Sequence, residues 1–141
     1  MTRKEAREQA FALLFEKTFS DSTIEEIIGN AVIGRELEVD PYAKRLVHAT
    51  LFHLEEIDAI VEPNLRKWSK SRISRVALTS LRCAVCEMVY DSEIPVSVSI
   101  NEAVELAKKY STKEDSSFVN GVLSSVAKSL PAEAAKGKEE Q

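Results

Sequence analysis

The feature that most constrains the fold is the stretch of residues 94–123, where two apolar stripes begin, separated by a short polar break. The members of the first stripe are Ile100, Ala103, Val104 and Ala107. The second stripe follows the break at residues 111–114, and its members are Phe118, Val119, Val122, Leu123 and Val126. Both have the spacing of one helix face, and helices joined by so short a turn pack together. The sequence therefore predicts an antiparallel helical hairpin.

Local preferences mark the ends of this hairpin. Pro95 and the β-branched valines after it disfavour a helix, so we expect an extended entry and a first helix that begins near Ser99. Asp115 or Ser116 offers a side-chain oxygen to cap the free amides at the start of the second helix. Gly121 inside that helix is unfavourable by about 1 kcal/mol relative to alanine. We explain this glycine by the close approach of a neighbouring helix.

Four further helices are expected before the hairpin, at residues 3–18, 24–34, 41–61 and 74–88. Asp40 followed by Pro41 is typical of a helix start, because the acid caps the free amides and proline fits the first turn. Pro63 lies past the end of the third helix, where it opens a short turn through Leu65 and Trp68. The sequence shows no alternation of strands and helices.

The expected fold is therefore all-α, a bundle of about six to seven helices in two packed helical subdomains. A chain of 141 residues is long enough for one domain with a real core. We expect the subdomains at residues 1–62 and 72–130, divided near residues 63–71. The polar tail at residues 131–141 lacks an apolar stripe, and we expect it to be disordered.

Composition limits the classes of function. The formal net charge is −4, which argues against indiscriminate binding to nucleic acid or membranes. No apolar run reaches the length of a membrane span, and the N-terminal residues MTRKEAREQ hold no apolar signal region. A cytoplasmic protein without a membrane contact is the expectation.

The two cysteines, Cys83 and Cys86, form a C-x-x-C inside the expected fourth helix. A redox pair needs a helix N-terminus, and a zinc site needs four ligands. His48 and His53 lack the spacing of a zinc finger, so we interpret both cysteines as packing residues and expect no metal or cofactor. The sequence also holds no paired nucleophile and base and no glycine-rich phosphate loop, so we expect no enzymatic activity.

Three cations stand at the start of the first helix: Arg3, Lys4 and Arg7. Positive charge there opposes the helix dipole, by about 0.3–1 kcal/mol for each exposed side chain. One interpretation is a solvated helix end. The other is that an external anion, such as an RNA phosphate, resolves the conflict.

Three segments resemble one known family. INEAVELAKKY followed by SSFVNGVL is similar to the C-terminal signature of the NusB family of bacterial transcription antitermination factors. The preceding RISRVALTSLRCAVCEM and the N-terminal TRKEAREQAFALLFE are similar to the corresponding helices of that family. The resemblance spans residues 2–130.

This resemblance implies a function without catalysis. Such a protein binds boxA-type single-stranded leader RNA together with NusE, a ribosomal protein. The complex joins other Nus factors and elongating RNA polymerase, and it suppresses termination in ribosomal RNA operons. Some family members also self-associate, so a homodimer is among the implied assemblies.

Two alternatives remain open at this point. The chain can be a protein-interaction scaffold with weak or no RNA binding of its own, which its acidic charge favours. NusB-like domains also accompany RNA cytosine methyltransferases, but no methyl-donor domain follows here.

The resemblance also implies where RNA binds. The family carries an arginine-rich RNA-binding motif at the N-terminal end, which here is short and matches Arg3, Lys4 and Arg7. Phe15 stands where a tyrosine is common. The hairpin turn lies near bound RNA in the family, which adds Tyr110, Lys113 and Phe118 to the expected RNA-binding residues.

Other side chains have predicted structural or partner roles. We expect Arg82 and Glu102, which fall among apolar neighbours, to form a structural ion pair or to bond the backbone. At the end of the fourth helix we expect Glu87, Val89 and Tyr90 to be exposed and to contact the protein partner.

Overall fold

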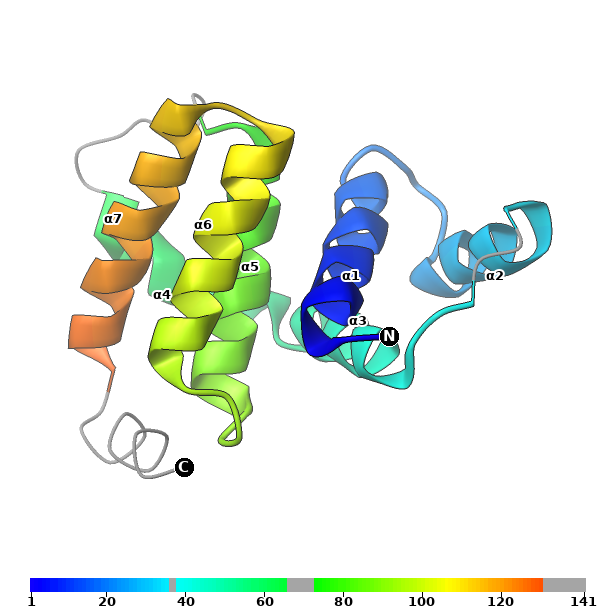
Figure 1. The fold of residues 1–141 in the computed structure, drawn as a ribbon, viewed down its shortest axis with the longest axis horizontal. Helices are drawn as coiled ribbons and strands as arrows, with labels where there is room; N and C mark the ends of the chain where they lie inside the picture. Colours follow the sequence, from blue (N-terminus) through cyan, green and yellow to red (C-terminus); the bar gives the residue numbers. More distant parts are fainter. Residues whose placement is uncertain (36–37, 66–72, 131–141) are drawn as a thin grey trace.

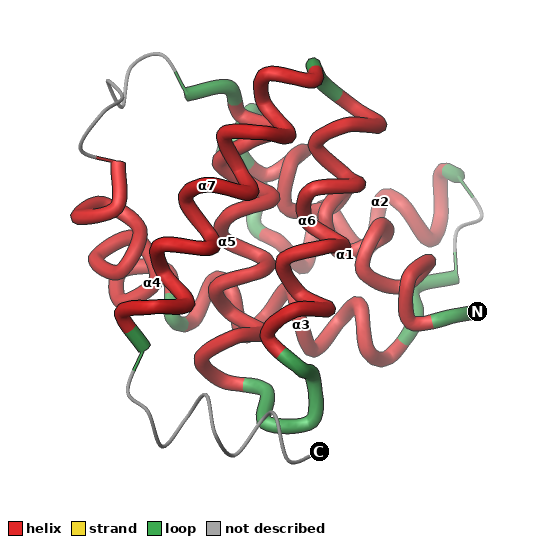
Figure 2. The backbone as a smooth tube through the Cα atoms, turned by 60° about the vertical axis from the view of Figure 1, so that its left-hand side comes forward, coloured by secondary structure: helices red, strands yellow, loops and turns green. Residues whose placement is uncertain are grey.

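A computed structural model describes residues 1–35, 38–65 and 73–130, and the residues it describes form seven α-helices and one short 3-10 helix without a strand (Figures 1 and 2). The elements are α1 (Arg3–Lys17), α2 (Ile24–Gly34), α3 (Pro41–Phe52), α4 (Leu54–Val61), η1 (Glu62–Leu65), α5 (Arg75–Tyr90), α6 (Val96–Tyr110) and α7 (Lys113–Ser129). The all-α prediction is confirmed. Trp68 and the tail at residues 131–141 lie outside the described residues, as do the expectations placed on them.

Polar caps set the start of most helices. Thr2 and Thr23 each accept a hydrogen bond from the backbone of a glutamate three residues on, and that glutamate bonds back to the cap residue. Asp40 caps α3 ahead of Pro41, and Ser74 caps α5 by accepting a bond from the Ala77 amide at 3.0 Å. Sequence signals of this kind are local, so they locate these boundaries correctly.

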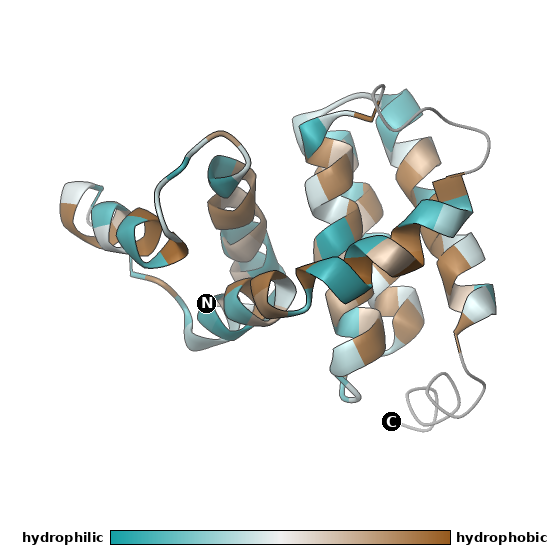
Figure 3. Ribbon diagram, turned by 180° about the vertical axis from the view of Figure 1, so that it is seen from behind, coloured by the Kyte–Doolittle hydropathy of each residue, from teal (hydrophilic) through white to brown (hydrophobic). Residues whose placement is uncertain are grey.

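The expected helix at residues 41–61 is wrong, because His53 divides it into α3 and α4. The His53 backbone leaves the helical region at φ −99° and ψ 17°, although its amide still closes the last turn of α3 by donating to the Ala49 carbonyl at 3.0 Å. The change of direction lets α3 pack against α1 while α4 packs against α5 and α7. Figure 3, seen from behind, shows α4 lying across the C-terminal helices. Apolar periodicity continues through the break and gives no sign of it.

The hairpin of α6 and α7 is confirmed, but both of its helix starts are wrong. α6 begins at Val96 because Pro95 stands at the N-cap, where its carbonyl accepts the Val98 amide at 3.0 Å. Proline restrains the residue before it, not the residues after it. α7 is capped by Thr112, whose hydroxyl accepts the Asp115 amide at 3.0 Å. The expectation for Gly121 is also wrong, because this glycine is exposed and an added Cβ would meet no atom within 4 Å.

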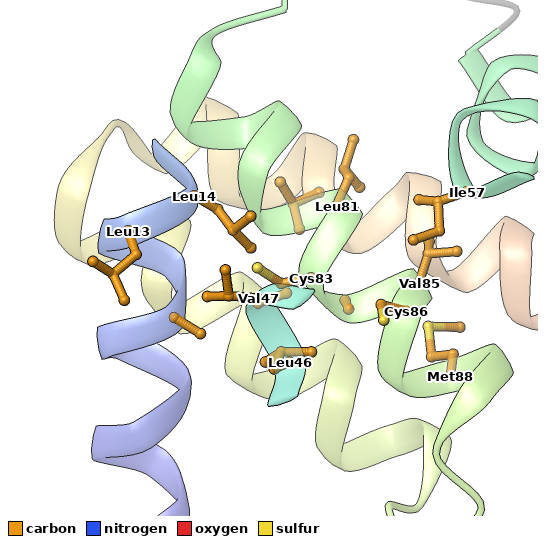
Figure 4. Packing of buried hydrophobic residues seen from close by; sticks show 14 of the residues in the cluster. Leu13, Leu14, Leu46, Val47, Ile57, Leu81, Cys83, Val85, Cys86 and Met88 are labelled. Atoms are coloured by element: carbon orange, nitrogen blue, oxygen red, sulfur yellow. The ribbon is translucent and has the colours of Figure 1, made fainter. Parts of the chain in front are cut away.

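α5 is the central helix, and it packs against α1, α3, α4, α6 and α7. Its fully buried side chains include Leu81, Val85 and Met88, which meet residues of α1, α3 and α4 in the core (Figure 4). Cys83 and Cys86 lie in this core and form no disulfide, as expected for packing residues. Burial raises the pKa of the Cys83 thiol well above its ordinary value, so it stays protonated.

Figure 1 shows α1, α2 and α3 on one side and α4 to α7 on the other. The helix α4 ends before residue 63, yet it packs with the second group. The division near residues 63–71 stays a prediction. No helix among the described residues has the length and apolarity that crossing a membrane requires.

Candidate nucleic-acid interface

The start of α1, which carries Arg3 and Lys4, lies beside α3 (Figure 1). Arg3 and Lys4 are exposed, and the Arg3 guanidinium carbon lies 3.8 Å from the ring centroid of Tyr42. Arg45 of α3, also exposed, lies 5.7 Å from the same centroid. Among the described residues, no carboxylate is within ion-pair distance of Arg3 or Arg45. Both therefore keep an uncompensated charge that an external anion can meet.

Arg7 has a different environment from Arg3 and Lys4. Its side chain is 8% exposed, and its Nε lies 2.8 Å from Oε2 and 3.0 Å from Oε1 of Glu87. The same carboxylate accepts hydrogen bonds from the Tyr42 hydroxyl and, at 3.0 Å, from the Ser99 hydroxyl. These four side chains, here called the Glu87 network, come from α1, α3, α5 and α6. Burial and the adjacent carboxylate raise the pKa of Tyr42, so its hydroxyl stays a donor.

The Glu87 network corrects one expectation. Glu87 is 2% exposed, so it does not offer a surface contact to a protein partner. It is buried because α5 packs against α1, α3 and α6, whose side chains surround the Glu87 carboxylate. Of the two side chains predicted beside it, Val89 is half-buried and Tyr90 is 40% exposed. The Tyr90 ring stacks on His53 at 3.7 Å between centroids.

Four aromatic side chains lie in a line along α1 and form what we call the aromatic row: Tyr110, Phe11, Phe15 and Phe19. Tyr110 stacks on Phe11 at 5.5 Å between centroids, and Phe11 stacks on Phe15 at 5.9 Å. Phe15 meets Phe19 edge to face at 5.0 Å. Phe11 is buried and Phe15 is half-buried, whereas both ends of the row are open. The Arg75 guanidinium covers the Phe19 ring at 4.2 Å.

Glu8 ties α1 to the end of α6. Its carboxylate accepts hydrogen bonds from Lys109 Nζ at 2.5 Å and from the Tyr110 hydroxyl at 2.7 Å. These two bonds favour the ionised carboxylate and hold the pKa of Glu8 below its ordinary value. Beside them, Lys4 and Lys108 line an open cavity together with glutamates of α6. This end of the aromatic row is therefore polar, with charges of both signs.

The turn between α6 and α7 is held by Asp115. Its carboxylate accepts hydrogen bonds from Ser111 and, at 2.7 Å, from the Ser74 hydroxyl at the start of α5. Lys113 is exposed at this turn, while Phe118 is half-buried and packs against the core. Lys113 and Phe118 line one shallow depression, so the structure brings these two predicted residues together.

Arg82 forms a structural ion pair, as expected, but its partner is Asp58 and not Glu102. Arg82 binds Asp58 of α4 through two hydrogen bonds of 2.9 Å, from Nε and from Nη2. Glu102 instead lines the cavity beside Lys4. The Arg82 pair fixes α4 on α5, and its residues lie 24 positions apart in the sequence.

The predicted RNA-binding residues thus fall into three places. Arg3 and Lys4 lie at the start of α1, Phe15 and Tyr110 lie in the aromatic row, and Lys113 and Phe118 lie at the hairpin turn, whereas Arg7 lies inside the Glu87 network. Sequence reasoning missed four residues of these surfaces: Phe11, Phe19, Arg45 and Arg75. The phenylalanines at 11, 15 and 19 recur every four residues, which is a helical-face signal that was open to detection.

The described residues hold no group of three or more histidine, cysteine or acidic side chains arranged to bind a metal ion.

Residues 4–128 match the model of the NusB family. The chain is 42% identical over 127 residues to the transcription antitermination protein NusB of Listeria monocytogenes serotype 4b (strain CLIP80459), covering 90% of this chain and 97% of that protein. It is 43% identical over 130 residues to the protein of the same name from Geobacillus kaustophilus, covering 92% and 98%.

Solved structures agree with the sequence relatives. A structure of T. maritima NusB is 34% identical, with a TM-score of 0.84, and the match covers 100% of this chain and 99% of that one. A crystal structure of antitermination factors NusB and NusE in complex with dsRNA is 32% identical, with a TM-score of 0.80 and coverage of 91% and 97%.

Proposed function

Because this chain belongs to the NusB family, we propose that it is a transcription antitermination factor that binds boxA-type single-stranded RNA together with the ribosomal protein NusE. The observation that carries the proposal is the likeness over nearly the whole chain to a NusB that was crystallised with NusE and dsRNA. In this proposal the complex joins other Nus factors and RNA polymerase in the cytoplasm and supports processive transcription of ribosomal RNA operons. The role is one of binding, without catalysis.

The surface of α1 supports RNA as the ligand. Exposed cations at its start meet phosphates, and open aromatic side chains along it meet unpaired bases. We assign phosphate contacts to Arg3, Lys4 and Lys113. We assign base contacts to Tyr110 and Phe15, with Phe118 at the edge of the hairpin depression.

Arg7 takes an indirect part in this proposal. Its ion pair with Glu87 occupies the guanidinium inside the protein, so a phosphate would have to compete with a buried carboxylate. We propose that Arg7 fixes the orientation of α1 and thereby the direction of the exposed side chains on it.

The scaffold alternative has its own support. The burial of Arg7 leaves the short basic motif with two exposed cations, Arg3 and Lys4, and the whole chain carries a net charge of −4. A protein with so small a positive field gains much of its RNA affinity from a partner. In the alternative, the chain binds NusE and holds RNA weakly or not at all.

Titration of boxA RNA with the full chain, with and without NusE, tests the proposal. Positive coupling of about 1–3 kcal/mol corresponds to NusE tightening RNA binding roughly 5- to 150-fold, and RNA must tighten NusE binding by the same factor. A boxA sequence with scrambled bases is the control. Equal affinity for boxA and scrambled RNA in the presence of NusE would contradict the proposal. NusE binding without any RNA binding would favour the scaffold.

A further inference from the structure

We infer that Phe19 and Arg75 form a stacking site for one unpaired RNA base at the far end of the aromatic row. The site extends the proposed RNA-binding surface past the residues that the family resemblance indicates, and it rests on the proposed function. The ligand is a single-stranded nucleotide, whose base stacks on the Phe19 ring and the Arg75 plane and whose phosphate meets the Arg75 charge.

The exposure and order of the two side chains suit this ligand. The Phe19 side chain is a large apolar group, and this residue is 62% exposed. Its ring is held in place by the edge-to-face contact with Phe15 and by the guanidinium carbon of Arg75, 4.2 Å from its centroid. Arg75 in turn donates from Nη1 to the Thr18 carbonyl at 3.2 Å. A base therefore meets flat groups that are already ordered, so little conformational entropy is lost on binding.

The charge of Arg75 is available to an anion. Arg75 is exposed, and among the described residues no carboxylate lies within ion-pair distance of it. Its hydrogen bond to the Thr18 carbonyl uses one of five donors, so others remain for a phosphate. Lys17 at the end of α1 adds a second cation close by in the sequence. A planar cation on an aromatic ring with free donors is suited to nucleic acid.

Continuity with the proposed RNA surface favours RNA over a protein partner. The row runs from Tyr110 through Phe11 and Phe15 to Phe19, and cations stand at both of its ends, Lys109 at the first and Arg75 at the second. α1 spans 15 residues, or about 22 Å, which is long enough for several nucleotides of an extended strand. Exposed rings with a cation beside them at each end of the row suit the bases and phosphates of such a strand.

Substitutions at Phe19 test the stacking. In titrations of the full chain with boxA RNA and NusE, we expect Phe19→Ala and Phe19→Leu to weaken RNA binding about 5- to 150-fold. Phe19→Trp retains a stacking surface and should keep the wild-type affinity or exceed it. Phe52→Ala is the matched control, because Phe52 is 82% exposed and stands on α3, outside the row. That variant should bind RNA as the wild type does.

Salt dependence separates the roles of the two residues. Phe19→Ala should leave the slope of log affinity against log salt unchanged, because stacking releases no counterions. Arg75→Gln should make the slope less negative by about 0.7, the value for one phosphate contact on a single strand. NusE affinity in the absence of RNA should be unchanged in every variant.

Three results would overturn the inference. The first is wild-type RNA affinity in Phe19→Ala and Arg75→Gln while the wild type binds boxA RNA, which removes this site and leaves the proposed function intact. The second is wild-type RNA affinity in Phe19→Leu but reduced RNA affinity in Phe19→Ala, where Phe19→Ala also binds NusE more weakly. That result would assign Phe19 to a protein contact. The third is a wild-type chain that binds no RNA even with NusE, which removes the proposed function and this site together.

Discussion

Replacement of Arg7 with methionine should lower the free energy of unfolding by about 3–5 kcal/mol. The change leaves Glu87 buried, at 2% exposure, with hydroxyl donors from Tyr42 and Ser99 but without a positive charge. Methionine keeps much of the aliphatic volume of arginine, so the loss reflects the uncompensated carboxylate more than a cavity. The network joins α1, α3, α5 and α6, so the whole domain should feel the loss.

The size of this effect makes it measurable. Domains have unfolding free energies of about 5–15 kcal/mol, so Arg7→Met should remove a large part of the total. For a chain of this length the expected fall in melting temperature is roughly 10–20 °C. Urea unfolding followed by far-ultraviolet circular dichroism gives the free energy, and an unchanged m-value would show that the native state is still compact.

A matched control and a double-mutant cycle isolate the pair. Arg35 lies 3.4 Å from Glu16 with side-chain exposures of 57% and 42%, so Arg35→Met should change stability by less than about 0.5 kcal/mol. Glu87→Gln removes the buried charge, and the Arg7→Met, Glu87→Gln double variant should be more stable than the sum of the single effects predicts, by about 1–3 kcal/mol.

The reasoning fails if Arg7→Met unfolds at the same urea concentration as the wild type. It also fails if this variant keeps its stability but loses RNA affinity and shows a salt slope less negative by about 0.7. That pair of results would make Arg7 a direct phosphate ligand, as the family motif alone implies.

Three other predictions concern separate parts of the molecule. Gly121→Ala should raise the free energy of unfolding by up to about 1 kcal/mol, since the site is helical, exposed and open, and a lower urea midpoint would contradict this. The Cys83→Ala, Cys86→Ala double variant should lose stability but keep RNA and NusE binding; stoichiometric zinc in the purified wild type would refute the packing role. The hydrogen bond from Lys109 lowers the pKa of the Glu8 carboxyl in the folded state. The contact therefore stabilises the fold above the unfolded-state pKa near 4.5, and this stabilisation is lost as the pH falls through the folded-state pKa. NMR titration should show a higher Glu8 pKa in Lys109→Ala, and an unchanged pKa would contradict this.

Local signals in the sequence are sufficient for most of the fold. The stripe spacing gives the hairpin, and the polar residues that cap α2, α3 and α5 mark where these helices begin, because each signal lies within a few residues of the boundary it sets. The break at His53 has no such signal. The break follows from the contacts that α4 makes with α5. Asp58 of α4 binds Arg82, and the His53 ring at the break stacks on Tyr90. Contacts of this kind between distant segments cannot be obtained from periodicity.

The proposed RNA surface shows the same limit at Arg7. Arg7 and Glu87 lie 80 positions apart, and no local pattern indicates that one neutralises the other in the interior. Their pairing also has a consequence for the surface. Phe11 and Phe15 stand four and eight residues after Arg7, on the same side of α1. A helix that turns Arg7 inward to Glu87 therefore sets the angle at which Phe11 stacks on Tyr110 and on Phe15. The ion pair thus orients the face of α1 that carries the aromatic row. If the row binds bases as proposed, an Arg7 variant should disturb those contacts although Arg7 does not make them.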